Sequence, residues 1–146
     1  MKRTEALRRL SRQHHQGLAV ALQLKRATEA SAAAAREAFL EFWQREGRIH
    51  FRAEEEVLLP AFARRAAPDH EAVVRVLVEH VDLRRQAYEL GRDDQPVAEA
   101  LHGLGARLEA HIRHEERVLF PLIEDALPPA ELERMAAELE RAEAGR

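Results

Sequence analysis

The sequence predicts an all-α protein: an up-down-up-down four-helix bundle followed by a short C-terminal fifth helix. Ala, Leu, Glu and Arg dominate the composition, and β-branched and aromatic residues are few, so helix is favoured almost throughout. Apolar residues recur at helical spacing over four long segments that short connections join, and antiparallel packing is the natural arrangement for such helices. No segment shows the alternation that would indicate a strand.

The first predicted helix covers about residues 4–30, and the second covers about residues 31–63. Pro60 lies near the end of the second helix, and Pro121 lies at the equivalent place in the fourth. Because proline lacks a backbone donor and its ring crowds the preceding turn, we expect each helix to kink or end there.

The segment AAPDHE interrupts the helical pattern before the third helix, which ends near residue 90. Asp69 in this segment is a candidate N-cap. The segment GRDDQP, residues 91–96, is the clearest turn in the chain. Asp93 or Asp94 can cap the fourth helix there, with Pro96 in its first turn, and this helix ends near residue 126.

The segment LPPAELERMAAELERAEAG is typical of a short helix that starts near Pro129. We therefore divide the chain into a bundle, residues 1–128, and a C-terminal helix, residues 129–146, that either belongs to the same domain or faces a partner. A chain of 146 residues is long enough for one domain with a substantial core.

The composition excludes several classes of function. Hydrophobic residues make up 46% and charged residues 34% of the chain, as in an ordinary globular protein. The net charge of −3, without a separate basic patch, gives no electrostatic reason to expect nucleic acid. The absence of cysteine excludes disulfides, thiolate catalysis and sulfur-ligated metals, so any metal here must bind nitrogen and oxygen.

The chain also carries no sign of export or of membrane insertion. The N-terminal segment MKRTEALRRLSRQHH is charged and lacks the apolar core of a signal peptide. No apolar run approaches the roughly eighteen residues that a membrane span requires. We therefore expect a cytoplasmic protein without a membrane partner.

Two segments of the sequence resemble each other closely. HFRAEEEVLLP, residues 50–60, and HIRHEERVLFP, residues 111–121, agree at seven of eleven positions without gaps. Each contains a histidine, a glutamate one helical turn later, and an apolar run closed by proline. This repetition indicates a duplicated unit with a shared chemical task.

A helical wheel at 100° per residue places one histidine at the centre of the apolar stripe of each long helix. The stripes consist of Leu7, Leu10, Leu18, Ala21 and Leu22 in the first helix, with Leu24 at the edge; Phe39, Trp43, Val57 and Ala61 in the second; Val73, Val76, Leu83, Ala87 and Leu90 in the third; and Leu104, Leu108, Leu119 and Leu122 in the fourth. The polar residues on these stripes are His14, His50, Glu54, His80, His111 and Glu115. Of the remaining histidines, His15 and His114 lie at stripe edges, His70 lies near a helix start, and His102 points away.

Two inward glutamates without an inward Lys or Arg require compensation, because an unpaired buried charge costs several kcal/mol. A cation at the centre provides it, whereas the alternative is a metal-free, hydrogen-bonded polar core. Six side chains exceed the needs of one tetrahedral zinc ion. They suit two metals, each with two histidines, bridged by the two carboxylates, and iron, manganese or zinc fits such ligands.

The sequence resembles the hemerythrin-like family, also called the HHE cation-binding domain. Four segments carry the resemblance: the QH of the first helix, HFRAEEEVLLP, the EH of the third helix and HIRHEERVLFP. The resemblance covers the first through fourth helices. It implies that His14, His50, Glu54, His80, His111 and Glu115 bind two iron ions with an oxo or hydroxo bridge. Glu54 and Glu115 would be the bridging carboxylates.

The sequence departs from the oxygen-carrying members of that family. Carriers have a second histidine one turn along the third helix, where this chain has Arg84, and an aspartate five residues after the fourth-helix histidine. Here Glu115 follows His111 by four residues, and the wheel turns Glu116 outward. His15, His114 or Glu46 could supply a further contact.

Three functions are compatible with these residues. The first is a di-iron protein that senses or reacts with oxygen, nitric oxide, peroxide or iron, rather than carrying oxygen. The second is a di-iron enzyme, namely a peroxidase, a nitric-oxide reductase or an iron oxidase. The third is a structural bundle held by one metal such as zinc. The expected ligand is a small diatomic molecule or peroxide, and a homodimer or an unknown protein partner stays open.

Overall fold

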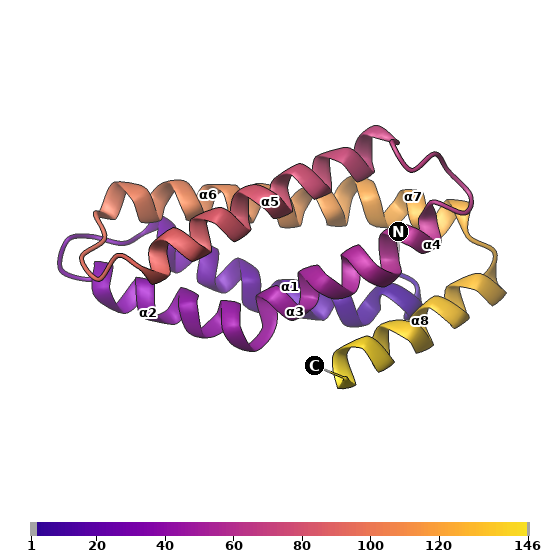
Figure 1. Cartoon of the computed structure of the whole chain (residues 1–146), viewed down its shortest axis with the longest axis horizontal. Coiled ribbons are helices and arrows are strands. Elements are labelled where there is room, and N and C mark those ends of the chain that lie inside the picture. The colour runs from indigo at the N-terminus through magenta and orange to yellow at the C-terminus, as the bar shows by residue number, and fades with distance from the viewer. Residues whose placement is uncertain (1–2, 146) are drawn as a thin grey trace.

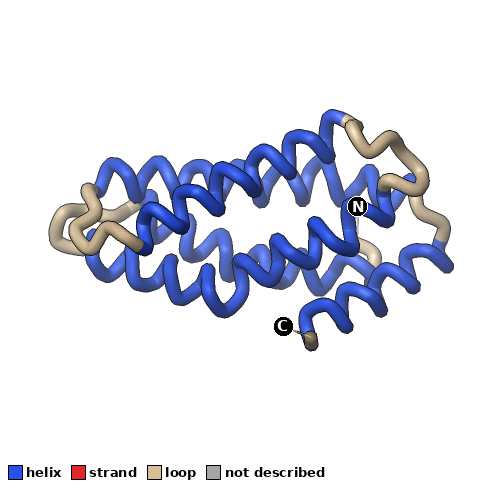
Figure 2. Tube along the Cα trace, in the orientation of Figure 1, coloured by secondary structure: helices blue, strands red, loops and turns tan. Residues whose placement is uncertain are grey.

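The computed structural model describes residues 3–145, and every regular element in that range is helical (Figure 2). Four helical rods run antiparallel along the long axis, and α8 lies against one end of them (Figure 1). The rods are α1 (Glu5–Lys25); α2 (Ala32–Phe42), η1 (Trp43–Gly47), α3 (Arg48–Ala53), η2 (Glu54–Leu58) and α4 (Leu59–Phe62); α5 (Glu71–Gly91); and α6 (Ala98–His114), η3 (Glu115–Leu119) and α7 (Phe120–Ala126). The fifth helix, α8, covers Pro129–Ala144. The predicted four-helix bundle with a short C-terminal helix is confirmed.

The first helix ends earlier than predicted. α1 stops at Lys25 rather than near residue 30, and a tight turn follows in which Thr28 and Ser31 bond to each other. The Thr28 amide donates to Ser31 Oγ over 2.9 Å, and the Ser31 amide donates to Thr28 Oγ1 over 3.2 Å. These hydroxyls offer the backbone an alternative to further helical turns.

The predicted caps of the third and fourth rods are wrong. His70, not Asp69, caps α5, because its Nδ1 accepts a hydrogen bond of 3.1 Å from the Ala72 amide. α6 begins at Ala98, so Pro96 precedes the helix instead of lying in its first turn. Asp93 stabilises the turn itself, where its carboxylate accepts from the Gln95 amide over 3.0 Å.

All the buried residues of α1 except Val20 follow a seven-residue repeat. Its members are Leu7, Leu10, His14, Gly17, Ala21 and Leu24. Leu22, predicted in the stripe, is 42% exposed, whereas Leu24, predicted at the edge, is fully buried. A wheel at 100° per residue drifts by about 20° per heptad against a seven-residue repeat, which accounts for the error.

Both copies of the repeat contain a π-helical turn that the sequence analysis did not predict. In η2 the Leu59 amide bonds to the Glu54 carbonyl, five residues back, and in η3 the Phe120 amide bonds to the Glu115 carbonyl. Pro60 and Pro121 follow at once, and neither ends its helix, since α4 continues to Phe62 and α7 to Ala126. The wider turn makes room for a residue without an amide hydrogen.

Each π turn also rotates the apolar face by one residue. Leu58 and Phe62 are buried where Val57 and Ala61 were predicted, and Ile123 is buried where Leu122 was predicted. The residue inserted into the helical repeat causes this displacement. The stripe predictions for α5 and for the first half of α6 are confirmed.

Two apolar clusters fill the bundle, one on each side of the inward histidines. The first cluster includes Leu7, Leu10, Phe62, Val76, Leu119, Phe120 and Ile123, together with Leu132, Met135 and Leu139 of α8. The second includes Val20, Leu24, Phe39, Leu83, Leu104 and Leu108. Along α1 and α5 the histidine therefore lies where one cluster gives way to the other. No helix among residues 3–145 combines the length and the apolar character that crossing a membrane would require.

Candidate metal centre

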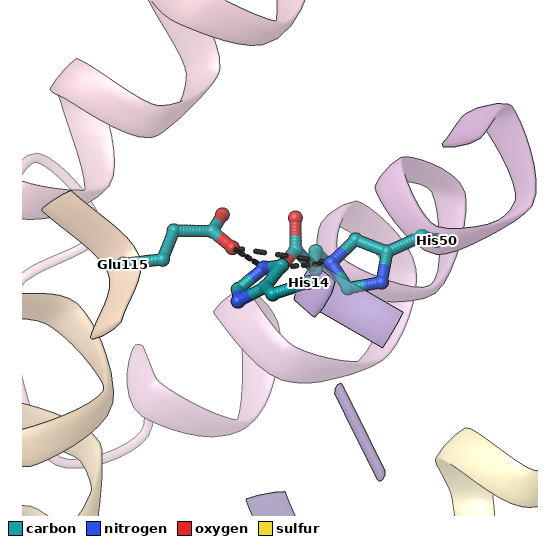
Figure 3. Close-up of side chains that lie close together, drawn as sticks. His14, His50 and Glu115 are labelled. Atoms are coloured by element: carbon teal, nitrogen blue, oxygen red, sulfur yellow. Dashed lines mark hydrogen bonds and ion pairs between the residues drawn. The ribbon is translucent and has the colours of Figure 1, made fainter. Parts of the chain in front are cut away.

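The six predicted residues converge at the middle of the bundle. His14 comes from α1, His80 from α5 and His111 from α6, while His50 lies on α3. Glu54 and Glu115 are the first residues of η2 and η3. All six are buried, and Figure 3 shows His14, His50 and Glu115 pointing toward one another.

The six residues form two groups that share both carboxylates. One group contains His14 and His50, the other contains His80 and His111, and Glu54 and Glu115 belong to each. The ligand atoms of each group lie within 4.8 Å of one another. Clustered imidazole and carboxylate groups of this kind fit a metal site.

Each carboxylate turns one oxygen toward each histidine pair. Glu54 Oε2 lies 3.0 Å from His50 Nε2, and Glu54 Oε1 lies 3.1 Å from His80 Nε2. Glu115 Oε1 lies 2.9 Å from His14 Nε2, and Glu115 Oε2 lies 3.2 Å from His111 Nε2. This is the orientation that a carboxylate bridging two metals would take.

The outer nitrogens of the histidines bond to residues on neighbouring rods. His14 Nδ1 lies 2.6 Å from Glu116, and His80 Nδ1 lies 2.7 Å from Glu55. An ionised carboxylate can only accept, so each Nδ1 carries a proton, and when the ring is neutral its Nε2 presents a lone pair to the centre. Outer partners of this kind orient histidine ligands in metal sites.

The other two histidines continue the pattern. His111 Nδ1 lies 2.8 Å from Glu79 Oε1, and His50 Nδ1 lies 2.6 Å from the Gln13 side-chain oxygen. The four links close a ring around the bundle. They run from α1 to η3, from α6 to α5, from α5 to η2 and from α3 to α1.

Three of these outer acceptors are paired with arginine. Arg3 lies 3.3 Å from Glu116, Arg84 lies 3.0 Å from Glu55, and Arg75 lies 3.0 Å from Glu79. In contrast, Glu54 and Glu115 pair with no Lys or Arg anywhere in the described part of the chain, and their ion-pair partners there are histidines. Among the carboxylates that face the four histidines, the two without an arginine partner in the described structure are therefore Glu54 and Glu115.

Acceptors face acceptors at the centre when the histidines are neutral. With the proton on Nδ1, each Nε2 has only a lone pair to offer a carboxylate oxygen about 3 Å away, which is repulsive unless a cation lies between them. Four atoms of the second group, His80 Nε2, His111 Nε2, Glu54 Oε1 and Glu115 Oε2, are buried without a hydrogen-bond partner in the described structure. The donor set fits divalent metal ions.

The same geometry makes the histidines unusually basic. Burial opposes protonation of His50, but the charges of Glu54 and Glu115 outweigh it and raise the pKa of His50 to about 10. Burial likewise opposes protonation of His111, and Glu115 and Glu79 raise its pKa to about 10. Burial would raise the pKa of Glu115, yet the surrounding histidines hold it well below its usual range. The site attracts positive charge, as protons or as metal.

The other candidate contacts lie outside the two groups. His15 is exposed. His102, which was predicted to point away from the core, is exposed too, with a ring nitrogen 2.6 Å from the Ala27 carbonyl. His114 is buried, but neither of its ring nitrogens has a hydrogen-bond partner in the described structure. Glu46 is exposed and lines a cavity beside His14 and His50.

A small cavity opens beside the first histidine pair. It measures about 20 Å³, which is room for one water-sized molecule. Its apolar walls come from Phe42, Leu108 and Ile112, and Gly17 and Gly47 also line it. A Cβ at Gly17 would lie 2.8 Å from Ile112 Cδ1, and one at Gly47 would lie 2.8 Å from the Trp43 ring.

Sequence reasoning missed the outer acceptors, although a signal was present. Each acceptor adjoins an inner residue in the chain: Gln13 precedes His14, Glu79 precedes His80, Glu55 follows Glu54, and Glu116 follows Glu115. One step along a helix turns the side chain by about 100°, away from the centre and toward the next rod. Glu116, predicted to face outward, therefore holds His14.

Comparison with known proteins agrees with this site. The family model of the hemerythrin HHE cation-binding domain matches residues 5–123, which include all six inner residues. The chain matches none of the curated proteins and none of the solved structures with which it was compared. The buried histidines and glutamates fit a metal-binding domain of the matched type. The chain therefore belongs to the hemerythrin HHE cation-binding domain family.

Proposed function

We propose that His14, His50, Glu54, His80, His111 and Glu115 bind two iron ions, and that the protein senses or reacts with oxygen, nitric oxide, peroxide or iron. One observation carries this proposal: two histidine pairs share two carboxylates, each of which turns one oxygen to either pair. Imidazole and carboxylate ligands suit iron, and manganese or zinc could occupy the same donors.

Where the oxygen carriers have their additional histidine on the third helix, this chain has Arg84, which has a different role. Arg84 bonds to Glu55 over 3.0 Å, and its guanidinium lies 5.8 Å from the centres of the Phe51 and Trp43 rings. It therefore supports the outer partner of His80 rather than offering a ligand. Oxygen carriers have five histidines, so one of their metals has an additional histidine. This chain offers two histidines to each metal, and this difference favours reaction or sensing over reversible oxygen transport.

The cavity beside His14 and His50 supports a ligand of diatomic size. Its volume of about 20 Å³ is room for one small molecule. Phe42, Leu108 and Ile112 give this side of the site an apolar lining. Two bound irons would supply redox chemistry toward oxygen, nitric oxide or peroxide, while the chain orients the ligands and limits access.

The test is metal content per chain after purification without oxygen, with an absorption spectrum before and after air. Two irons per chain, with new near-ultraviolet and visible bands on oxidation, would support the proposal. One spectroscopically silent metal would overturn it in favour of a structural site. Sustained turnover of peroxide, nitric oxide or ferrous iron by the loaded protein would identify an enzyme instead of a sensor.

A further inference from the structure

One of the four outer links differs from the others. His14, His80 and His111 each donate directly to a carboxylate that an arginine pairs. His50 instead donates to the neutral amide of Gln13 over 2.6 Å. In this fourth link the carboxylate bonds to Gln13 instead of to the histidine, and it belongs to α8.

That carboxylate is Glu143. Gln13 Nε2 donates to Glu143 Oε1 over 2.8 Å, and Arg9 Nε donates to Glu143 Oε2 over 2.7 Å. Glu143 is only 6% exposed, although it lies in the last turn of the terminal helix. α8 also lies beyond the family match, which ends at residue 123.

Glu143 determines which end of the Gln13 amide faces His50. A glutamine amide can present either its oxygen or its NH₂ group, and its orientation follows from its partners. An ionised carboxylate accepts only, so Glu143 draws the NH₂ group of Gln13 toward itself and leaves the oxygen for His50 Nδ1–H. Without Glu143 the amide could flip and favour the proton on His50 Nε2, where it would block a metal.

We infer that Glu143 is a positioning residue for the metal centre, and that seating of α8 and metal occupancy at the His14–His50 pair depend on each other. This inference rests on the proposed function of the six inner residues. Coupling between two sites is reciprocal, so a metal at His50 also stabilises the seated α8. The helix thereby carries the state of the centre to the surface of the bundle.

The packing of α8 suits such a role. Leu132, Met135 and Leu139 join the apolar cluster on one side of the site. A helix of 16 residues is marginal by itself in water, so its structure depends on that packing and on the contacts of its last turn. Glu143 is buried among its partners, and a buried carboxylate is costly unless they hold it.

Stepwise Fe²⁺ titration of the metal-free full chain without oxygen tests the inference, with Glu143→Leu beside the unchanged chain. Leucine keeps the volume and removes the acceptor. We expect one of the two irons to bind about 10–100-fold more weakly and the other to bind unchanged. Glu140→Gln, at an exposed position on the same helix, is the matched control and should leave both affinities unchanged.

A double variant separates positioning from general damage to α8. In Gln13→Glu with Glu143→Gln, the carboxylate moves to the inner position and the amide to the outer one. His50 would still donate to an acceptor, so we expect both affinities to recover. In addition, Fe²⁺ should slow amide hydrogen exchange in residues 139–144 of the unchanged chain.

The outcomes distinguish this inference from the proposed function. If the unchanged chain binds no iron, both are overturned. If it binds two irons but Glu143→Leu binds them equally well, only the role of Glu143 is overturned. A double variant as weak as Glu143→Leu, with circular dichroism confirming an intact helix content, would likewise reject the positioning role.

Discussion

Glu54 and Glu115 hold equivalent places in the two copies of the repeat, and their carboxylates meet the same four histidines from opposite rods. Each is the first residue of a π-helical turn. Each also divides its two oxygens between the His14–His50 pair and the His80–His111 pair. The two copies of the repeat in the sequence thus place two equivalent carboxylates on either side of the four histidines in the structure.

Loss of an inner residue should lower metal content. His50→Ala removes a ring nitrogen and Glu115→Ala removes a carboxylate from the proposed metal site, so we expect the metal content per chain to fall. His102→Ala is the control, because that side chain contacts the Ala27 carbonyl and lies outside both groups. Elemental analysis of the purified chains measures the effect. A metal-free His102→Ala beside a fully loaded Glu115→Ala would contradict the assignment.

Metal uptake should release protons. The carboxylates raise the pKa values of His50 and His111 to about 10 in the metal-free chain, so a metal must displace protons from both rings at neutral pH. Affinity should therefore rise as the pH increases from about 7 toward 10. Calorimetric titration with zinc in buffers of different ionisation enthalpy counts the protons released. An affinity independent of pH over this range would refute the prediction.

The same groups should make the metal-free fold less stable in base. The folded pKa of about 10 for each exceeds the ordinary histidine value of 6.5, so the folded chain binds more protons than the unfolded chain between these limits. Their contribution to stability is complete below about pH 6.5 and is lost as the pH rises through 10. Thermal melts of metal-free protein at pH 7 and pH 9.5 should show a lower midpoint at the higher pH. His102→Ala should show the same dependence, whereas His50→Ala should show less of it.

The outer carboxylates should matter for affinity without touching the metal. Glu79→Ala leaves His111 Nδ1 without its acceptor, so the ring is no longer held in the ligating tautomer. We expect one metal to bind about 10–100-fold more weakly. Glu89→Ala on the same helix is the control, since Glu89 is exposed and pairs only with Arg85 in the described structure. Equal affinities for these two variants in a metal titration would argue against an orienting role.

Two glycines of α6 should respond oppositely to alanine. A Cβ at Gly105 would lie 2.7 Å from the Ala21 carbonyl of α1, so Gly105→Ala should destabilise the fold by about 1–3 kcal/mol. A Cβ at Gly103 meets nothing within 4 Å, so Gly103→Ala should stabilise it by about 0.5–1 kcal/mol through helix propensity. Urea denaturation of both metal-free variants measures the difference. Effects of the same sign would show that α1 and α6 do not meet closely at Gly105.

The sequence alone determined the helical architecture and the inward residues. Periodicity reports which face of a helix is buried, and a charged or polar residue at the centre of that face is conspicuous. His14, His50, His80 and His111 were identified in this way, as were Glu54 and Glu115. Periodicity fails where the helical repeat itself changes, which is why the apolar residues after the two π turns were displaced by one position.

Only the tertiary structure decided how the inner residues are supported. Which rod lies opposite another is a property of packing, and hydrogen bonds such as His14 to Glu116 close only once distant segments meet. The hydrogen bonds from His50 to Gln13 and from Gln13 to Glu143 join residues of α3, α1 and α8, and no local sequence pattern predicts them. The sequence specifies which side chains each helix presents on each face, whereas the packing of the bundle determines which side chains of the neighbouring helices they contact.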